Sequence, residues 1–214
     1  MSALGHWDRP TIDRLNFLDR GSRIYEGVKE QFDDAWRHTG RSGDVQAVLL
    51  DRKYALEASQ PGWRRLFHGT KRACNIGDLG YDLELCNDNG CHLCGILRNS
   101  FDIEHAGTEG RQPMFGHGIY TSSVSSKADI YTMNQHIYSP MHAMLLCSVY
   151  VGRSEKLFQA DHSRTSPSYG YDSVEGVTKS NGGTLDYPET VVYNEASIVP
   201  IGLIMYTRKG WQPF

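Results

Sequence analysis

Two tyrosines eleven residues apart mark the stretch of the sequence whose residue types point most clearly to ligand binding. Tyr120 ends a short apolar run, and Tyr131 follows a turn of small polar residues. We expect a strand that ends at Tyr120 and a short helix that carries Tyr131. The N-cap of that helix is expected at Ser122, Ser123 or Ser125. Two rings that face each other across a slot can hold a planar aromatic ligand. The alternative is a strand–turn–helix corner whose tyrosines fill a core.

Four of the five cysteines lie close together in a turn-rich stretch. They are Cys74, Cys86, Cys91 and Cys94, whereas Cys147 lies in a predicted strand. An odd and clustered set favours a metal site or free thiols over a disulfide framework. Thiolates suit tetrahedral zinc, so we predict one structural zinc ion held by the four clustered cysteines. His92 is a spare ligand, and the alternative is a set of reduced, partly buried thiols.

The composition is that of an ordinary globular protein. The chain has 214 residues, of which 39% are hydrophobic and 22% are charged, and its formal net charge is −3. This length suits one domain with a small additional segment, and we expect a monomer. Because the chain has no excess of basic residues, nucleic acid is not indicated as its main partner.

Neither a membrane span nor a secretory signal is recognisable in the sequence. No apolar run reaches the length that a membrane-spanning helix needs. The first residues lack the basic region and the apolar core of a signal peptide. We therefore expect no membrane association, and the clustered free cysteines favour a reducing compartment, the cytoplasm or the nucleus.

Several helices and strands are expected to position these residues. The spacing of apolar residues predicts a helix over 22–38. Strands are expected over 45–50, 63–68, 143–151, 189–193 and 197–206, with a short edge strand at 171–174. The nearly continuous apolar run at 143–151 indicates a central strand with both faces covered. An apolar segment at 96–101 is expected to be helical.

Three fragments then follow one another along the chain. They are Leu66-Phe67-His68-Gly69-Thr70, then Gly118-Ile119-Tyr120 with Ser125-Ser126-Lys127 and Tyr131, and finally Tyr193-Asn194-Glu195. Together with the segment 170–174, they resemble the catalytic domain of the poly(ADP-ribose) polymerase family, the diphtheria-toxin-like ADP-ribosyltransferases with a His-Tyr-Glu triad. The resemblance covers residues 63–206, about two thirds of the chain.

The resemblance implies an α+β fold. In this fold two apposed, mainly antiparallel β-sheets enclose an NAD cleft. Residues 1–62 would form an N-terminal helical segment, an appendage to the fold. Residues 63–214 would form the ADP-ribosyltransferase catalytic domain, with a cysteine-rich insertion at 74–94.

The resemblance also implies roles for single residues. His68, Tyr120 and Glu195 match the catalytic triad, and Tyr131 matches the tyrosine that stacks on nicotinamide. Gly69 would hold the nicotinamide carboxamide through its backbone, which requires the close approach that glycine permits. The alternative for Glu195 is a solvated carboxylate in a loop. The full predicted NAD-binding set is His68, Gly69, Thr70, Tyr120, Ser126 and Tyr131.

One position departs from the family pattern. Ala128 stands where the best-known members have a serine that bonds the carboxamide. This departure leaves the triad intact, but it lowers the expected affinity for nicotinamide and for inhibitors that resemble nicotinamide.

The implied function is an NAD-dependent ADP-ribosyltransferase that releases nicotinamide. We expect it to mono-ADP-ribosylate a protein acceptor, and the zinc ion has no part in the chemistry. Ubiquitin is the first candidate acceptor, because domains of this type resemble ubiquitin-modifying members of the family. The alternatives are an NAD glycohydrolase, with water as the acceptor, and a catalytically silent module that binds ADP-ribose or protein. The presence of Glu195 with His68 and Tyr120 favours an enzyme.

Overall fold

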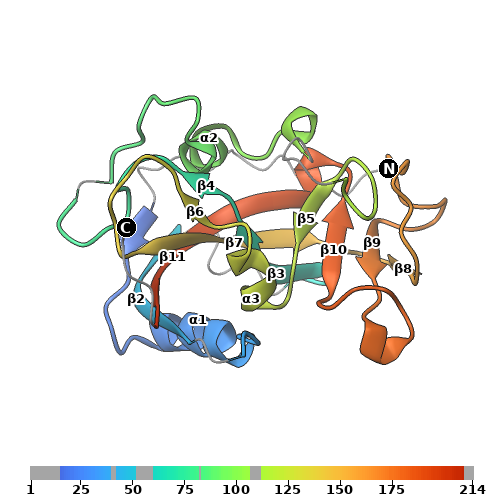
Figure 1. The fold of residues 1–214 in the computed structure, drawn as a ribbon, viewed down its shortest axis with the longest axis horizontal. Coiled ribbons are helices and arrows are strands. Elements are labelled where there is room, and N and C mark those ends of the chain that lie inside the picture. The colour runs from blue at the N-terminus through green and yellow to red at the C-terminus, as the bar shows by residue number, and fades with distance from the viewer. Residues whose placement is uncertain (1–14, 40–41, 52–59, 82, 107–111, 210–214) are drawn as a thin grey trace.

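The larger β-sheet of the protein is built around two long apolar strands. The computed structural model describes residues 15–39, 42–51, 60–81, 83–106 and 112–209 (Figure 1). Strands β7 (His142–Tyr150) and β11 (Ile198–Arg208) pair side by side, and nearly all of their residues are buried. The sheet has the order β1-β2-β11-β7-β3, and every pair in it is antiparallel. Its remaining strands are β1 (Leu15–Phe17), β2 (Gly43–Asp51) and β3 (Trp63–Gly69).

A second, smaller sheet stands beside the first (Figure 1). Its order is β5-β10-β9-β8, and only β8 and β9 run parallel. The strands are β5 (Ile119–Thr121), β10 (Glu189–Val192), β9 (Ser173–Gly176) and β8 (Ser154–Leu157). A short parallel pair joins β4 (Lys71–Arg72) to β6 (Met133–Asn134). Two mainly antiparallel sheets with few helices confirm the predicted α+β fold.

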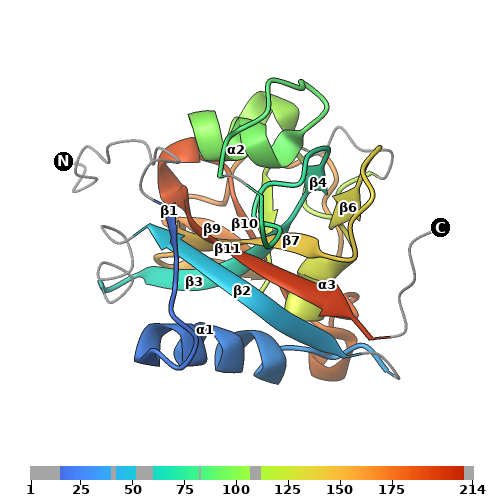
Figure 2. The same cartoon turned by 90° about the vertical axis from the view of Figure 1, so that its left-hand side faces the viewer.

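Helices cover both faces of the larger sheet. Figure 2 shows α1 (Arg23–Asp34) on one side and α2 (His92–Asn99) on the other. The short α3 (Ser125–Asp129) follows β5, and three single 3₁₀ turns lie at Ile103–His105, Lys179–Asn181 and Glu195–Ser197. None of the helices in the described ranges is long and apolar enough to cross a membrane.

Helix α1 forms as the sequence predicts. The Ser22 hydroxyl accepts a hydrogen bond from the backbone N–H of Tyr25 at 3.2 Å, which satisfies one of the free donors of the first turn. Tyr25, Val28 and Phe32 form a buried stripe at helical spacing, and the Phe32 ring meets Phe67 of β3 edge to face. The helix predicted over 22–38 is confirmed, although its regular part ends at Asp34.

The main predicted strands are confirmed, and one assignment is wrong. The segments 45–50, 63–68, 143–151, 189–193 and 197–206 correspond to β2, β3, β7, β10 and β11. The segment predicted as an edge strand at 171–174 becomes β9, which lies between β10 and β8. The error arises because β8 has the sequence Ser-Glu-Lys-Leu, which shows no alternation of apolar and polar residues.

The starts of two helices also differ from expectation. Val124, not a serine, is the N-cap of α3, and its side chain makes no capping bond. Ser122 instead accepts from the Val124 N–H at 3.0 Å and donates to the Pro188 carbonyl at 2.6 Å. This serine therefore ties the turn after β5 to the start of the neighbouring strand β10. Helix α2 begins at His92, four residues before the expected start of the helical segment.

The N-terminal part of the chain is joined to the larger sheet. Strand β2 pairs with β11 over seven residue pairs, and β1 pairs with β2. The division of the chain at residue 62 stays a prediction, and the sheet runs across that boundary.

A buried arginine fixes the chain after β3. Arg72 is 1% exposed, and its guanidinium donates to Asp78 Oδ1 at 2.7 Å and to the Met141 carbonyl at 2.7 Å. It also donates to the Ile76 carbonyl at 3.0 Å and to the Ser139 hydroxyl at 3.2 Å. These bonds hold the segment after β4 against the start of β7.

Replacing Arg72 with methionine should lower the free energy of unfolding by about 3–5 kcal/mol, because the buried Asp78 carboxylate would lose its positively charged partner. Urea denaturation measures this loss. The control is Arg23→Met at an exposed position of α1, where about 0.5 kcal/mol or less is expected. A loss below about 1 kcal/mol for Arg72→Met would contradict the role of the network.

Candidate active site

Two backbone hydrogen bonds join the edges of the two sheets. The backbone N–H of Phe67 donates to the Ser122 carbonyl at 2.8 Å, and the Ser122 N–H donates to the Phe67 carbonyl at 3.0 Å. Phe67 lies on β3, the last strand of the larger sheet, and Ser122 directly follows β5, the first strand of the smaller one. His68, which follows Phe67, and Tyr120, which lies two residues before Ser122, are therefore brought together.

The His68 ring is oriented by the backbone of β5. Its Nδ1 lies 2.8 Å from the Tyr120 carbonyl oxygen, and because a carbonyl can only accept, Nδ1 must carry the proton. Loss of hydration lowers the pKa of His68, although the bond to Tyr120 opposes this shift. The ring is thus neutral near pH 7, with Nε2 as a hydrogen-bond acceptor for a ligand hydroxyl.

The Tyr120 hydroxyl is satisfied within its own loop. It accepts from the Phe115 N–H at 2.9 Å and donates to the Gly116 carbonyl at 2.8 Å. Burial raises the pKa of Tyr120 well above its usual value, and the neighbouring Tyr193 and Glu189 add to this shift. Tyr120 is therefore uncharged, and its ring is held in one orientation.

Glu195 begins the 3₁₀ turn between β10 and β11. Asn194 caps this turn by accepting from the Ala196 N–H at 3.0 Å. Glu195 Oε1 accepts from the backbone N–H of Ile103 at 2.8 Å, and its residue is exposed. The carboxylate is thus accessible and held by a backbone donor from a distant part of the chain.

The short segment around Phe101 and Ile103 contacts two members of the predicted triad. The Phe101 ring packs edge to face on His68, with 5.0 Å between ring centres. Two residues later, Ile103 binds Glu195. No sequence motif assigned this segment to the site. The one available signal was an aromatic residue, Phe101, directly before Asp102.

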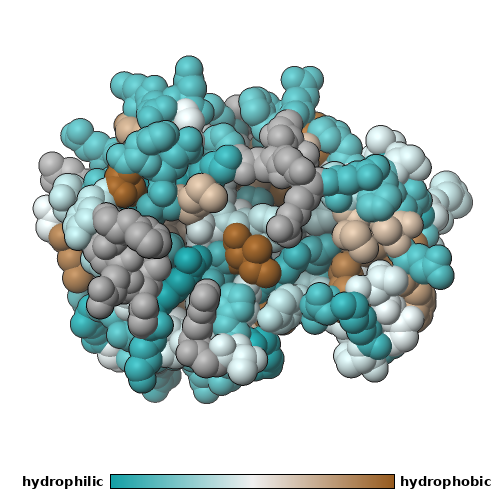
Figure 3. Space-filling model, viewed as in Figure 1, coloured by the Kyte–Doolittle hydropathy of each residue, from teal (hydrophilic) through white to brown (hydrophobic). Residues whose placement is uncertain are grey.

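Gly69 lies against the end of α3. A Cβ atom at this position would come within 1.9 Å of the Ala128 carbonyl oxygen and 3.1 Å of Tyr131 Cβ, so only glycine fits. Tyr131 is 49% exposed and is available to a ligand. Ile130 and Met133 are also about half exposed, and Figure 3 shows a small hydrophobic patch over the region of α3.

Two predicted NAD-binding residues have other contacts. Ser126 is fully buried, and its hydroxyl accepts from the backbone N–H groups of Arg37 and His38. It holds α3 to the end of α1, so we do not include it in the proposed nucleotide site. Thr70 follows β3, and its carbonyl accepts from the Met133 N–H at 3.4 Å.

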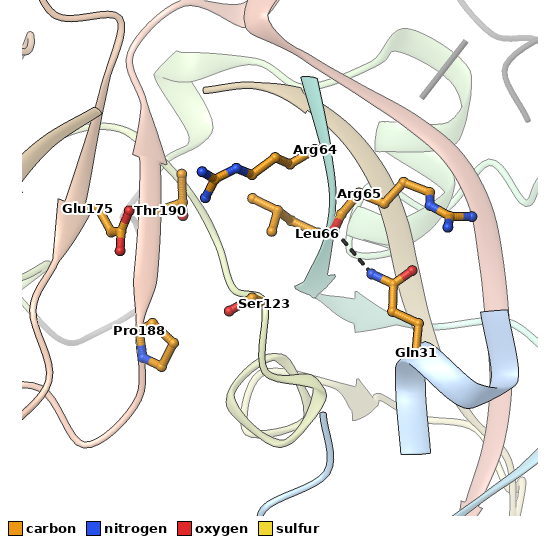
Figure 4. Close-up of a pocket in the computed structure, with 8 residues that line it drawn as sticks. All are labelled: Gln31, Arg64, Arg65, Leu66, Ser123, Glu175, Pro188 and Thr190. Carbon is orange, nitrogen blue, oxygen red and sulfur yellow. Dashed lines mark hydrogen bonds between the residues drawn. The ribbon is translucent and has the colours of Figure 1, made fainter. Parts of the chain in front are cut away.

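A cavity of about 350 Å³ opens between β3 of the larger sheet and β10 of the smaller one (Figure 4). Figure 4 shows the Gln31 amide donating to the Arg65 carbonyl at 3.2 Å at its border. Glu195, His68 and Tyr120 are not among the lining residues, so this cavity is distinct from the predicted triad. The lining residues are Gln31, Arg64, Arg65, Leu66, Ser123, Glu175, Pro188 and Thr190.

The four clustered cysteines converge in space. All four Sγ atoms lie within 4.8 Å of one another, with Cys74 Sγ 3.8 Å from Cys91 Sγ and 3.5 Å from Cys94 Sγ. Tetrahedral zinc with Zn–S bonds of about 2.3 Å places its sulfurs about 3.8 Å apart. Hydrogen bonds from the Cys74 and Cys94 thiols and from the Ala73 N–H hold the pKa of Cys91 well below its usual value. The four residues can therefore hold a metal ion.

A family model described as the poly(ADP-ribose) polymerase catalytic domain matches residues 89–208. The match covers more than half of the 214 residues. The chain belongs to the poly(ADP-ribose) polymerase catalytic-domain family. The match includes Tyr120, Tyr131 and Glu195, whereas His68 and Gly69 lie before it. No curated protein matches the chain. Membership supports ADP-ribosyltransferase activity with NAD⁺ as substrate.

Tyr131→Ala should weaken nicotinamide binding by about 0.5–1.5 kcal/mol beyond the lost contact area, because a stacking partner is removed. Isothermal titration calorimetry measures the change. Tyr131→Phe keeps the ring and should bind nicotinamide nearly as well as the unmodified chain. Tyr169→Ala, at a fully exposed tyrosine, is the matched control. Full retention of affinity in Tyr131→Ala would show that this residue does not line the nicotinamide site.

Proposed function

We propose that the protein is an active mono-ADP-ribosyltransferase that cleaves NAD⁺, releases nicotinamide and transfers one ADP-ribose to a protein acceptor. The observation that supports this most is the set of contacts linking the triad. His68 bonds the Tyr120 backbone, and the segment from Phe101 to Ile103 contacts both His68 and Glu195. These contacts link residues from segments that are far apart in the sequence, which supports the assignment of His68, Tyr120 and Glu195 to one site.

In the proposed complex, each residue has a distinct part. The Gly69 backbone would bind the nicotinamide carboxamide, and Tyr131 would stack on its ring. His68 would offer Nε2 to a hydroxyl of the adenosine ribose. Ala128 offers no hydroxyl to the carboxamide, so hydrogen bonds to the Gly69 backbone are expected to be the main polar contacts of nicotinamide.

Glu195 would stabilise the transition state in which the glycosidic bond of NAD⁺ breaks. Cleavage of the glycosidic bond of NAD⁺ develops oxocarbenium-like positive charge on the ribose, as in glycoside hydrolysis. A carboxylate bonded to the ribose 2′-hydroxyl stabilises this charge more in the transition state than in the ground state. The accessible oxygens of Glu195 and its fixed backbone donor suit this role.

Ubiquitin is our first candidate acceptor, on the basis of the resemblance to ubiquitin-modifying members of the family. Incubating the protein with labelled NAD⁺ and ubiquitin, followed by mass spectrometry, tests both the release of nicotinamide and the transfer of ADP-ribose. A single ADP-ribose on ubiquitin is the expected product. Nicotinamide release at the same rate with and without acceptor, and no labelled protein, would identify an NAD glycohydrolase. If no nicotinamide is released, the remaining alternative is a catalytically silent module that binds ADP-ribose or protein.

We also propose that the cysteine cluster holds one structural zinc ion. The sulfur distances suit tetrahedral ligation, and Cys91 and Cys94 lie at the start of α2, which packs on the larger sheet. When bound, zinc would fix the chain between Ala73 and α2. The segment from Phe101 to Ile103 follows α2 directly, so the metal would support the triad only indirectly.

Glu195→Gln should reduce the rate of nicotinamide release by about a hundredfold or more, as for the loss of other electrostatic stabilisers. The amide keeps an acceptor for the Ile103 N–H, and affinity for NAD⁺ should stay within about threefold, because the charge acts mainly on the transition state. Rate assays and calorimetry give both values. Glu104→Gln, at a nearby exposed carboxylate, is the control. Unchanged turnover in Glu195→Gln would remove Glu195 from the mechanism.

The purified protein should contain about one equivalent of zinc, as one tetrahedral site requires. A strong chelator should lower its melting temperature, because ligation contributes to folding free energy. Cys86→Ser should lose zinc, whereas Cys147→Ser, in the buried strand β7, should keep it. Elemental analysis without zinc, together with four alkylatable thiols in the native protein, would contradict the proposal.

A further inference from the structure

An ion pair lies next to Tyr131. Lys127 Nζ is 2.7 Å from Glu189 Oε1, and the two side chains are 19% and 6% exposed. The same ammonium donates to the Tyr131 hydroxyl at 3.0 Å and lies 4.9 Å from the centre of its ring. A continuous set of polar contacts therefore connects Glu189, on the first position of β10, to the ring of Tyr131.

The second carboxylate oxygen of Glu189 is buried. It has no hydrogen-bond partner among the residues that the structure describes. A buried carboxylate oxygen without a donor is costly, and buried ion pairs contribute little net stability. Stability alone therefore does not account for a carboxylate at this position.

The charge of Lys127 matters for a ligand on Tyr131. Burial disfavours the ammonium, but Glu189 and Tyr131 outweigh this effect and raise the pKa of Lys127 above its usual value. The nicotinamide ring of NAD⁺ carries a positive charge until the glycosidic bond breaks. A ring stacked on Tyr131 would lie within the screening length of about 8–10 Å from the ammonium. Without Glu189, the two positive charges would repel each other.

We propose that Glu189 is a positioning residue of the NAD⁺ site, which holds Lys127 against Tyr131 and neutralises its ammonium so that the site accepts a cationic ring. This inference rests on the proposed function, since it assumes that nicotinamide stacks on Tyr131. It assigns the Glu189 carboxylate, on β10, a role separate from that of Glu195 at the ribose.

Two uncleavable analogues separate charge from shape. Carba-NAD⁺ has a cationic pyridinium ring, and benzamide adenine dinucleotide has a neutral ring of the same outline. Glu189→Gln should weaken the binding of carba-NAD⁺ by about tenfold and that of the neutral analogue by less than about threefold. In the double variant Lys127→Met/Glu189→Gln, the ratio of the two dissociation constants should return to that of the unmodified chain. Glu175→Gln, on β9, is the matched control.

The opposite single variant provides an independent test. Lys127→Met leaves the negative charge of Glu189 without a cation. The ratio of the two dissociation constants should therefore shift in favour of the cationic analogue. Equal effects on both analogues in Glu189→Gln and Lys127→Met would indicate a purely structural role and overturn the inference. An unchanged ratio in both variants would overturn it as well. If the unmodified chain binds neither analogue, the proposed function fails, and this inference fails with it.

Discussion

The candidate site depends on two backbone hydrogen bonds that join the edges of the two sheets. The bonds between Phe67 and Ser122 are local, but they decide how far β3 lies from β5. His68 and Tyr120 take their positions from this bridge, because His68 follows Phe67 directly and Tyr120 lies two residues before Ser122. An edge strand exposes free N–H and C=O groups, and here that property is used to connect two sheets without merging them. Beyond the bridge, the strands separate and leave the cavity shown in Figure 4.

Helix α3 is the second fixed point of the site, and its support comes from distant parts of the chain. Buried Asp129 accepts hydrogen bonds from Tyr206 and Arg208 at the end of β11. Ser126 binds the backbone after α1. The segment after α1 and the end of β11 thus hold the five-residue helix α3, which carries Lys127 and precedes Tyr131. A helix this short has little stability of its own, so these contacts are necessary.

The sequence predicted most of the fold, because the long apolar strands and the amphipathic helix have strong periodic patterns. It also named His68 and Tyr120, which lie beside the bridge and contact each other. The features that it missed depend on pairing between distant segments. The polar strand β8 is a strand because it pairs with β9. The bond from Ile103 to Glu195 spans 92 residues, and that from His38 to Ser126 spans 88. No local pattern indicates such contacts, so Ser126 was expected at the ligand, whereas Phe101 and Ile103 were not assigned to the site.

We propose that His68, Gly69, Tyr131 and Glu195 form one nucleotide site at the junction of the sheets. A crystal structure of the protein with benzamide adenine dinucleotide would locate this site. We expect the benzamide ring on Tyr131, its carboxamide on the Gly69 backbone, and ribose hydroxyls within hydrogen-bond distance of His68 Nε2 and Glu195. A nucleotide bound elsewhere, for example in the cavity lined by Arg64 and Glu175, would contradict the account.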